Sequence, residues 1–228
     1  MKRLIVAIDG PAGAGKSTVA KRLAKELGYT YMDTGAMYRA FAWKVREGRI
    51  NLENEKELRA ALRDTRIELP EKDGQLRVLL DEADVTSQIR TPELSQWASK
   101  VSALRPVRER MVELQRAMGA WGGVVAEGRD IGTVVFPKAD VKIFLTASPV
   151  ERGRRRFEEL EGQGKRVTLQ ETVGEMEERD RRDQERAVAP LRKAEDAVVI
   201  DSSDLSVEDV LHRIMREVKT RMSGSNGT

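Results

Sequence analysis

A glycine-rich loop between a predicted strand and a predicted helix constrains the fold of this chain more than any other feature. Residues 4–8 form a short, continuously apolar run with β-branched members, which is typical of a buried parallel strand. The loop follows at 10–17, and apolar residues recurring on one face predict a helix over 16–27, which Gly28 ends. This order of strand, loop and amphipathic helix predicts an α/β domain built on a parallel sheet.

The loop has the pattern of a phosphate-binding site: a glycine, four residues, then Gly-Lys-Ser. Its glycines allow positive φ angles and a close approach of the backbone to phosphate groups, and the following helix presents its N–H groups to the anion. Lys16 is expected to reach the β- and γ-phosphates of a nucleoside triphosphate, and the Ser17 hydroxyl to bind Mg²⁺. The residues predicted to bind the nucleotide are Gly10, Pro11, Ala12, Gly13, Ala14, Gly15, Lys16, Ser17 and Thr18.

The rest of the chain alternates strands and helices with one interruption. Further strands are predicted at 29–32, 124–126, 141–146 and 197–200. Helices are predicted at 34–47, 92–103 and 107–118, in the charged stretch before the last strand, and after an N-cap at Ser206. Between 67 and 85 the pattern instead predicts short antiparallel strands with a turn at Asp73-Gly74. We therefore expect a core over 1–62 and 106–222, an insertion over 63–105 and a flexible tail over 223–228.

Composition removes several classes of function. The chain has no cysteine and one histidine, which excludes disulfides and thiolate metal sites and makes a Ser-His-Asp triad implausible. No signal-peptide pattern and no apolar run of about 20 residues is present, so we expect a soluble, cytoplasmic protein without a membrane partner. The pI of about 9.1 is compatible with nucleic-acid binding, but 41 Lys and Arg nearly balance 38 Asp and Glu. An arginine-lined phosphate site would give the same signature, and composition alone does not decide between the two.

The run Asp81-Glu82-Ala83-Asp84 offers a competing interpretation. It resembles the Walker B motif of RNA helicases, but such a helicase needs two RecA-like domains and a Ser-Ala-Thr motif, and the chain shows neither. The run also lies where we predict an antiparallel hairpin, so we interpret it as a solvent-exposed turn. An Asn-Lys-x-Asp guanine-binding motif is likewise missing, which disfavours a GTPase.

Two clusters of polar residues follow predicted strands, at the sheet edge where ligands of open α/β sheets bind. Asp33, Thr34 and Arg39 follow the second strand, where they suit either an anion site at a helix N-terminus or a simple helix cap. Glu127-Gly128-Arg129-Asp130 follows the third strand. Polar residues in that place favour a functional site over a core, and Glu127 could orient the water shell of a metal.

A third cluster lies on the helix predicted to start near Thr168. Leu169, Val173 and Met176 form an apolar stripe at helical spacing, and the same phase continues into Asp180 and Asp183. Arg179, Asp183 and Arg186 share a face at i, i+4 and i+7. Charges on an inward face are unfavourable unless something pairs with them, so we favour a cleft for a charged ligand over a solvated helix end.

Together these motifs resemble the bacterial cytidylate kinases of the nucleoside monophosphate kinase superfamily. The matching segments are IDGPAGAGKST at 8–18, DTGAMYR at 33–39, VVAEGRDIGTVVFP at 124–137, ERDRRDQERAVAPL at 178–191 and VVIDSSDLS at 198–206. The resemblance implies an α/β P-loop three-layer fold with a short lid at about 151–166, and a monophosphate-binding domain at 63–105 with a small antiparallel sheet. It also implies transfer of the γ-phosphoryl group from ATP to CMP or dCMP with Mg²⁺. We expect a monomer that binds no nucleic acid.

The resemblance also implies roles for individual residues. Catalysis would depend on Lys16, Arg129 and Arg186, with Ser17 and Glu127 at the metal and Arg156, among the arginines at 152–156, closing over ATP. The residues that would hold CMP are Asp33, Thr34, Arg39, Ser99, Arg108, Arg129, Asp130, Arg179 and Asp183. Among these, Thr34, Arg39 and Arg129 would hold its phosphate, Ser99, Arg108 and Asp130 would read cytosine, and Arg179 and Asp183 would contact the ribose.

Overall fold

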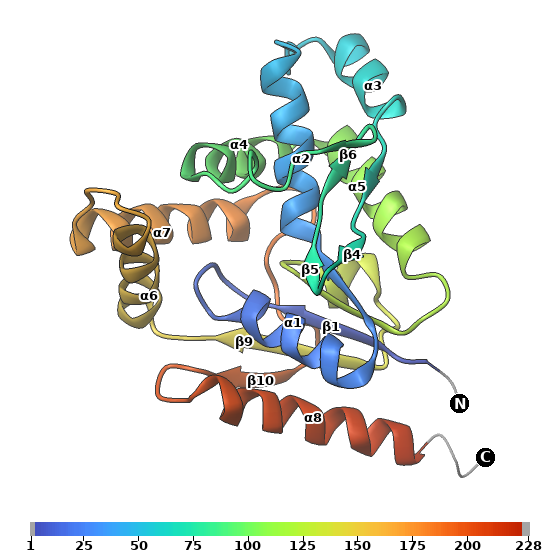
Figure 1. Ribbon diagram of the computed structural model, residues 1–228, viewed down its shortest axis with the longest axis vertical. Coiled ribbons are helices and arrows are strands. Elements are labelled where there is room, and N and C mark those ends of the chain that lie inside the picture. Colours follow the sequence, from blue (N-terminus) through green and yellow to red (C-terminus); the bar gives the residue numbers. More distant parts are fainter. Residues whose placement is uncertain (1–2, 225–228) are drawn as a thin grey trace. The chain divides into compact units, whose positions relative to one another are not determined.

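A computed structural model describes residues 3–224, which divide into two compact units (Figure 1). The first unit comprises 3–31 and 121–224, and the second comprises Met32–Ala120. Each unit has its own apolar core. The predicted insertion at 63–105 falls inside the second unit, which is longer at both ends because helices before and after the insertion share its core.

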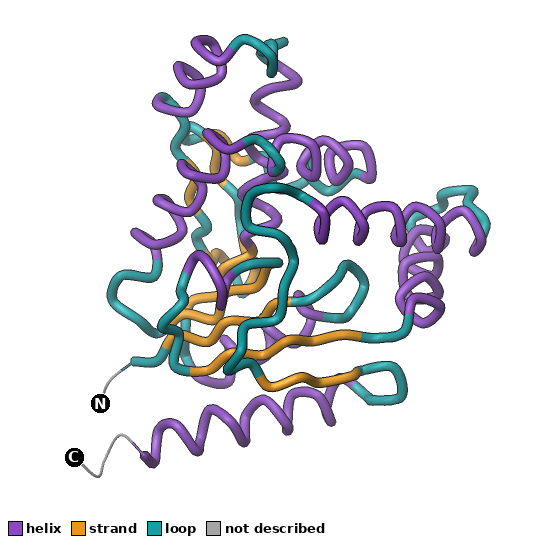
Figure 2. The backbone as a smooth tube through the Cα atoms, turned by 180° about the vertical axis from the view of Figure 1, so that it is seen from behind, coloured by secondary structure: helices purple, strands orange, loops and turns teal. Residues whose placement is uncertain are grey.

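The first unit is built on parallel strands, which Figure 2 shows in orange. The order in the five-stranded sheet is β10-β9-β1-β8-β2. The bounds are β1 Ile5–Asp9, β2 Thr30–Asp33, β8 Val124–Gly128, β9 Val141–Thr146 and β10 Val198–Asp201. Asp9 pairs in register with Gly128, so the loops that follow β1 and β8 leave the sheet at the same level. The predicted strands and their parallel arrangement are thereby confirmed.

Helices α1 (Lys16–Leu27) and α8 (Val207–Gly224) pack against this sheet and against each other. The reciprocal hydrogen bonds between Ser206 and Asp209 confirm the predicted start of α8. Its end differs from the prediction, since the helix continues through residues 223 and 224 of the expected tail; residues 225–228 lie outside the described part. Within 3–224, no helix is long and apolar enough to cross a membrane.

Helices α6 (Pro149–Gly162) and α7 (Leu169–Glu185) pack on each other in the first unit. A capping box between Thr168 and Glu171 starts α7. The predicted change from apolar to acidic along its inner face is confirmed, because Met176, Asp180 and Asp183 are all buried. One detail was wrong: Leu169 is 42% exposed, and Thr172 takes the first inward position instead.

The second unit consists mainly of helices around Phe41, Leu94 and Met111, which are completely or almost completely buried. Its helices are α2 Thr34–Glu47, α3 Glu55–Arg63, α4 Pro92–Ser102 and α5 Arg105–Met118. Helix α3 was not predicted from the sequence. It is short and buries only Leu58 and Leu62, so its apolar periodicity extends over a single repeat.

Short antiparallel strands complete the second unit: β3 Ile67–Glu68, β4 Glu71–Lys72, β5 Gln75–Leu76, β6 Leu79–Leu80 and β7 Ala83–Asp84. The predicted turn at Asp73-Gly74 is confirmed, with positive φ at both residues and β4 paired to β5. Asp81 and Glu82 form a second tight turn, between β6 and β7. The Asp-Glu-Ala-Asp run is therefore part of an antiparallel hairpin, as predicted, and not the end of a parallel strand.

Glu82→Gly is expected to raise the apparent Tm by about 2 °C, or roughly 0.5–1 kcal/mol, because Glu82 has φ 72° where a Cβ is unfavourable. Its exposed contact with Arg66, 3.9 Å long, contributes little to stability. Glu82→Ala is the matched control, since it removes the same carboxylate and keeps the Cβ. Differential scanning fluorimetry of both variants measures the Tm values. Equal Tm values for Glu82→Gly and Glu82→Ala would contradict backbone strain at residue 82. ATP turnover is expected to be unchanged in both, whereas a helicase-like site would lose it.

Candidate active site

The glycine-rich loop depends on glycine for two measurable reasons. Gly10, Gly13 and Gly15 have positive φ angles of 147°, 73° and 88°. A Cβ on Gly10 would lie 1.9 Å from the Leu145 carbonyl oxygen, and one on Gly13 would lie 2.6 Å from the Met176 methyl carbon. The backbone therefore passes too close to β9 for any side chain at Gly10, whereas at Gly13 the positive φ is the stronger reason, because the Met176 methyl group can move. After it, Ser17 and Thr18 are exposed on the first turn of α1.

Lys16 lies inside the loop and is only 5% exposed. Its Nζ donates a hydrogen bond to the Pro11 carbonyl oxygen at 2.5 Å. Burial, together with the positive charges of Arg129 and Arg179, lowers the pKa of Lys16 to about 7, although Glu127 opposes the shift. The accumulated positive charge in this buried place is the environment that a polyanion would neutralise.

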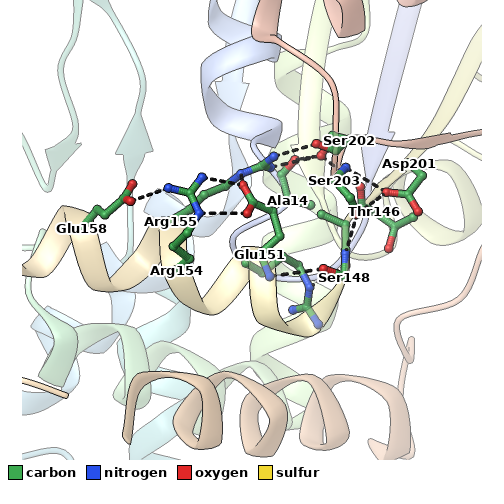
Figure 3. A network of polar contacts seen from close by, with 12 residues as sticks. Ala14, Thr146, Ser148, Glu151, Arg154, Arg155, Glu158, Asp201, Ser202 and Ser203 are labelled. Carbon is green, nitrogen blue, oxygen red and sulfur yellow. Dashed lines mark hydrogen bonds and ion pairs between the residues drawn. The ribbon is translucent and has the colours of Figure 1, made fainter. Parts of the chain in front are cut away.

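A set of hydrogen bonds that was not predicted from the sequence holds the loop to the ends of β9 and β10 (Figure 3). The Oγ of Ser202, which follows β10, lies 3.1 Å from the Ala14 carbonyl oxygen and 3.0 Å from that of Thr146, to which the Ser202 N–H also donates at 2.8 Å. Arg155 on α6 donates to the Ser202 carbonyl oxygen at 2.6 Å and pairs with Glu151 at 2.8 Å. Ser202 thus fastens the loop to the end of β10. A serine in a polar turn after a strand gives no signal of this role in the sequence.

The arginines predicted to close over ATP have different surroundings. Arg152 is buried, donates to the Ala12 carbonyl oxygen at 3.0 Å and pairs with Asp180 of α7. Asp180 also accepts a hydrogen bond from the Ala12 N–H at 3.3 Å. Arg156 is partly exposed and pairs with Glu159 on the same helix at 2.7 Å. Arg152 therefore supports the backbone of the loop, while Arg156, among the contacts of the described residues 3–224, pairs with a neighbour on its own helix.

A compact group of charged side chains lies where β8 ends and α7 ends. Arg129 donates from Nε to Asp183 Oδ2 at 2.9 Å. Arg186, the C-cap of α7, has its Nη2 3.6 Å from Asp130 Oδ1 and its Nη1 4.0 Å from Asp183 Oδ1. Burial alone would raise the pKa of Asp183, but Arg129, Arg179 and Arg186 together hold it below its usual value. The structure thus brings together residues that the sequence analysis identified in two separate motifs.

The turn after α7 holds Arg186 in this group. Its Nε donates to the Ala189 carbonyl oxygen at 2.6 Å, and the Leu191 N–H donates to the Asp183 carbonyl oxygen at 2.7 Å. Ala189 has a positive φ of 49°, which an alanine adopts only when its surroundings impose it. The side chain of Arg186 is 6% exposed, so this arginine is fixed and largely desolvated.

Glu127, in the last part of β8, is 5% exposed and accepts a hydrogen bond from the Tyr31 hydroxyl at 2.6 Å. Tyr31 was not recognised from the sequence. Within residues 3–224, no group of three or more His, Cys, Asp or Glu side chains is arranged to hold a metal. A carboxylate at Glu127 and an exposed hydroxyl at Ser17 are nevertheless the hard oxygen donors that suit Mg²⁺, which needs few protein ligands when phosphates supply the others.

The predicted site residues of the second unit form two groups. Asp33 caps α2 by accepting from the Ala36 N–H at 2.8 Å and pairs with Arg39 at 3.1 Å, beside the buried Thr34. The helix-cap interpretation of Asp33 is therefore correct, and its second oxygen also orients Arg39.

The other group contains Arg108 and Ser99, both of which contact Ser102. Arg108 is 2% exposed, donates to the Ser102 carbonyl oxygen at 3.1 Å and lies 5.5 Å from the centre of the Tyr38 ring. The Ser102 hydroxyl in turn donates to the Ser99 carbonyl oxygen at 2.9 Å. A buried arginine over an aromatic ring is a fixed donor.

Comparison with known proteins gives a consistent result. The family model described as "Cytidylate kinase" matches residues 6–220. The cytidylate kinase of Pelotomaculum thermopropionicum is 54% identical over 214 residues, covering 93% of this chain and 95% of that protein. The cytidylate kinase of Syntrophotalea carbinolica is 50% identical over 220 residues, covering 96% and 94%.

Among solved structures, an uncharacterised protein from Eubacterium ventriosum covers 95% of this chain and 99% of its own, with a TM-score of 0.53 and 14% identity. This likeness shows the fold alone.

The parallel sheet, the glycine-rich loop after its first strand and the buried lysine define a nucleotide-binding P-loop kinase. Within this class, the chain belongs to the cytidylate kinase family.

Proposed function

We propose that this protein transfers the γ-phosphoryl group of ATP to CMP or dCMP, giving CDP or dCDP, in the presence of Mg²⁺. Membership of the cytidylate kinase family supports this activity. The observation that carries the proposal is the buried group of Arg129, Asp130, Asp183 and Arg186 in the unit that also contains the glycine-rich loop. Fixed guanidinium groups of this kind bind phosphate oxygens and neutralise charge on them.

Phosphoryl transfer requires in-line positioning and neutralisation of the equatorial oxygens, and little covalent help from the protein. We assign the triphosphate to the loop 10–17 and Lys16, and charge neutralisation in the transition state to Arg129 and Arg186. The phosphate of a nucleoside monophosphate is already an anionic nucleophile, so no general base is required. Ser17 and Glu127 would hold Mg²⁺, which, when bound, supplies further positive charge to the phosphates.

We assign monophosphate-binding roles to residues of each unit separately. In the second unit, Thr34 and Arg39 would hold its phosphate, with Asp33 orienting Arg39, while Ser99 and Arg108 would contact cytosine. In the first unit, Arg129 would hold the phosphate, Asp130 would read cytosine, and Arg179 and Asp183 would contact the ribose. We further propose that 63–105 forms the monophosphate-binding domain and that 151–166, with Arg156, forms a lid over ATP. We also propose that the protein is a monomer and that it acts in the cytoplasm.

A coupled assay of ADP release tests the function directly. The purified protein is offered ATP, Mg²⁺ and, in turn, CMP, dCMP, UMP, AMP and GMP. We expect CMP and dCMP to give the highest kcat/KM, with turnover near the background rate for the purine nucleotides. Turnover that depends on RNA and needs no monophosphate would instead indicate a nucleic-acid-stimulated ATPase and would contradict the proposal.

Asp130→Asn is expected to reduce kcat/KM for CMP by about tenfold to a hundredfold and to leave the value for UMP unchanged or higher. A carboxylate accepts from the exocyclic amine of cytosine and repels the O4 of uracil, whereas an amide NH₂ can donate to O4. If Asp130 only braced its turn, both substrates would lose activity by the same factor. Asp130 is 5% exposed and its Oδ1 lies 3.6 Å from Arg186 Nη2, so the ratio between the two substrates, and not the CMP value alone, separates base reading from bracing.

Steady-state kinetics with both substrates measures this ratio. Asp130→Ala is the companion variant, because it removes the acceptor without adding a donor, and it should lower CMP activity without raising that of UMP. An unchanged ratio of CMP to UMP in both variants would remove Asp130 from the residues that read the base.

A further inference from the structure

Asp9, which the proposed mechanism does not use, is the last residue of β1 and directly precedes Gly10 of the loop. It is 4% exposed. Its Oδ1 accepts a hydrogen bond from the Ile131 N–H at 2.8 Å, and its Oδ2 accepts one from the Gly132 N–H at 2.7 Å. One carboxylate thus joins the start of the phosphate loop to a segment more than a hundred residues later in the chain.

The two N–H groups are the first of a short π-helix, η1 (Ile131–Val135), which immediately follows Arg129 and Asp130. The first N–H groups of a helix have no partner within the helix, and a side chain at the N-cap position usually accepts from one of them. Here the N-cap residue is Asp130, whose side chain does not do so. Asp9, at the end of β1, accepts these hydrogen bonds instead. The direction of the Asp130 side chain is therefore set by contacts other than capping.

The surroundings of this contact allow little movement. A Cβ on Gly132 would lie 3.2 Å from Lys142 Cδ and 3.4 Å from Asp9 Oδ2. Lys142 is held in turn by the Pro137 carbonyl oxygen at 2.6 Å and by Asp196 at 2.9 Å. The start of η1 is therefore enclosed by Asp9 and by a lysine whose own position is fixed.

Burying a carboxylate in this way is unfavourable by itself. Burial raises the pKa of Asp9 to about 6, and the hydrogen bonds from Gly132 and Ile131 act in the opposite direction. Near pH 7.5 the group is thus mainly ionised and accepts with both oxygens. An apolar residue at this place would avoid the desolvation but would leave two buried N–H groups without a partner, which is also unfavourable.

We propose that Asp9 is a positioning residue: by holding the first N–H groups of η1, it sets where Arg129 and Asp130 stand relative to the phosphate-binding loop. The register supports this, since Asp9 is opposite Gly128, the residue from which the Arg129-Asp130 segment leaves the sheet. This positioning role rests on the proposed function in one respect, namely that the ligand bound by Arg129 and Asp130 is CMP. Asp9 itself contacts no substrate in this scheme.

The test uses Asp9→Asn, which keeps the size of the side chain and replaces one acceptor oxygen by a donor. Asp140→Asn is the matched control: Asp140 Oδ2 accepts from the Ile5 N–H at 2.8 Å, at the opposite end of the same strand. In the nucleotide-free protein, hydrogen–deuterium exchange of the Ile131 and Gly132 amides should be about tenfold or more faster in Asp9→Asn and unchanged in the control. Unchanged exchange at both amides would overturn the proposal.

The second measurement separates positioning from general stability. Calorimetry should show CMP binding weakened about tenfold in Asp9→Asn, with binding of a non-hydrolysable ATP analogue within about twofold of wild type. An equal loss for both ligands, or no loss for CMP, would overturn the positioning role. Should Asp9→Asn not fold, Gly132→Ala introduces a Cβ 3.2 Å from Lys142 Cδ and 3.4 Å from Asp9 Oδ2, which disturbs the same first turn of η1 and should give the same selective loss. If wild type does not bind CMP, the proposed function is wrong, and the exchange rates still decide whether Asp9 holds η1.

Discussion

Arg186→Ala is expected to lower kcat for CMP phosphorylation by about a thousandfold or more, with a much smaller change in the KM for CMP. The reason is the fixed, desolvated state of its guanidinium group, which is 6% exposed and held by the Ala189 carbonyl oxygen. A positive charge that is already in place stabilises developing charge without reorganisation, so its loss appears mainly in the transition state. Such an arginine acting within its own chain accounts for rate factors of about 10³–10⁵ in related chemistry.

The control for Arg186→Ala is Arg181→Ala on the same helix. The Arg181 side chain is 62% exposed and pairs only with Glu178 among the contacts described for residues 3–224, so its removal should leave both kinetic constants within about twofold of wild type. Steady-state kinetics together with circular dichroism distinguishes the cases. If Arg186→Ala raised KM and left kcat unchanged, Arg186 would bind the ground state and its catalytic role would be wrong. Reduced helix content in the variant would show that the charge group serves to hold the end of α7.

Lys16→Met is expected to reduce CMP phosphorylation by at least about a hundredfold, because it removes a preorganised charge from the transferred group while keeping an unbranched side chain of similar size. The same substitution should raise the Tm of the nucleotide-free protein. Lys16 is buried in the free loop, and its charge is opposed there by burial and by Arg129. A methionine avoids this unfavourable desolvation. The variant would thus be more stable and inactive, which is the pattern expected for a residue retained for function.

The gain in Tm should depend on pH in a definite direction. The pKa of Lys16 is lowered from 10.5 to about 7 in the folded protein, so between these values the unfolded chain binds more protons than the folded chain. The contribution of Lys16 to wild-type stability therefore rises as the pH increases from about 7 to about 10.5. Consequently, the Tm difference between Lys16→Met and wild type should be largest at or below pH 7 and should shrink above it. Scanning calorimetry from pH 6 to 9.5 measures this, and a difference that grows with pH would contradict the buried charge.

Local signals in the sequence predicted much of the fold correctly. The bounds of α1 and α2 agree with the prediction because their limits are encoded by neighbouring residues: Gly28 ends the first, and Asp33 caps the second. The acidic continuation of the α7 stripe was also predicted from periodicity alone, and Asp180 and Asp183 are indeed buried. Where periodicity was short, as in α3, or where the helix was of an unusual type, as in η1, the sequence carried no usable signal.

The sequence by itself determined the parallel α/β class, the phosphate-binding loop and the set of charged residues that could form a site, because each is encoded by residues within about one helical turn or one strand. Only the tertiary structure decided which of these residues meet. It placed Arg129 against Asp183, fastened the loop through Ser202 and Arg152, and made Asp9 the cap of η1. These contacts join positions that are far apart in the chain. A buried charge or N–H group pairs with whichever group lies near it in the folded protein, and the spacing of residues in the sequence does not reveal which group that is.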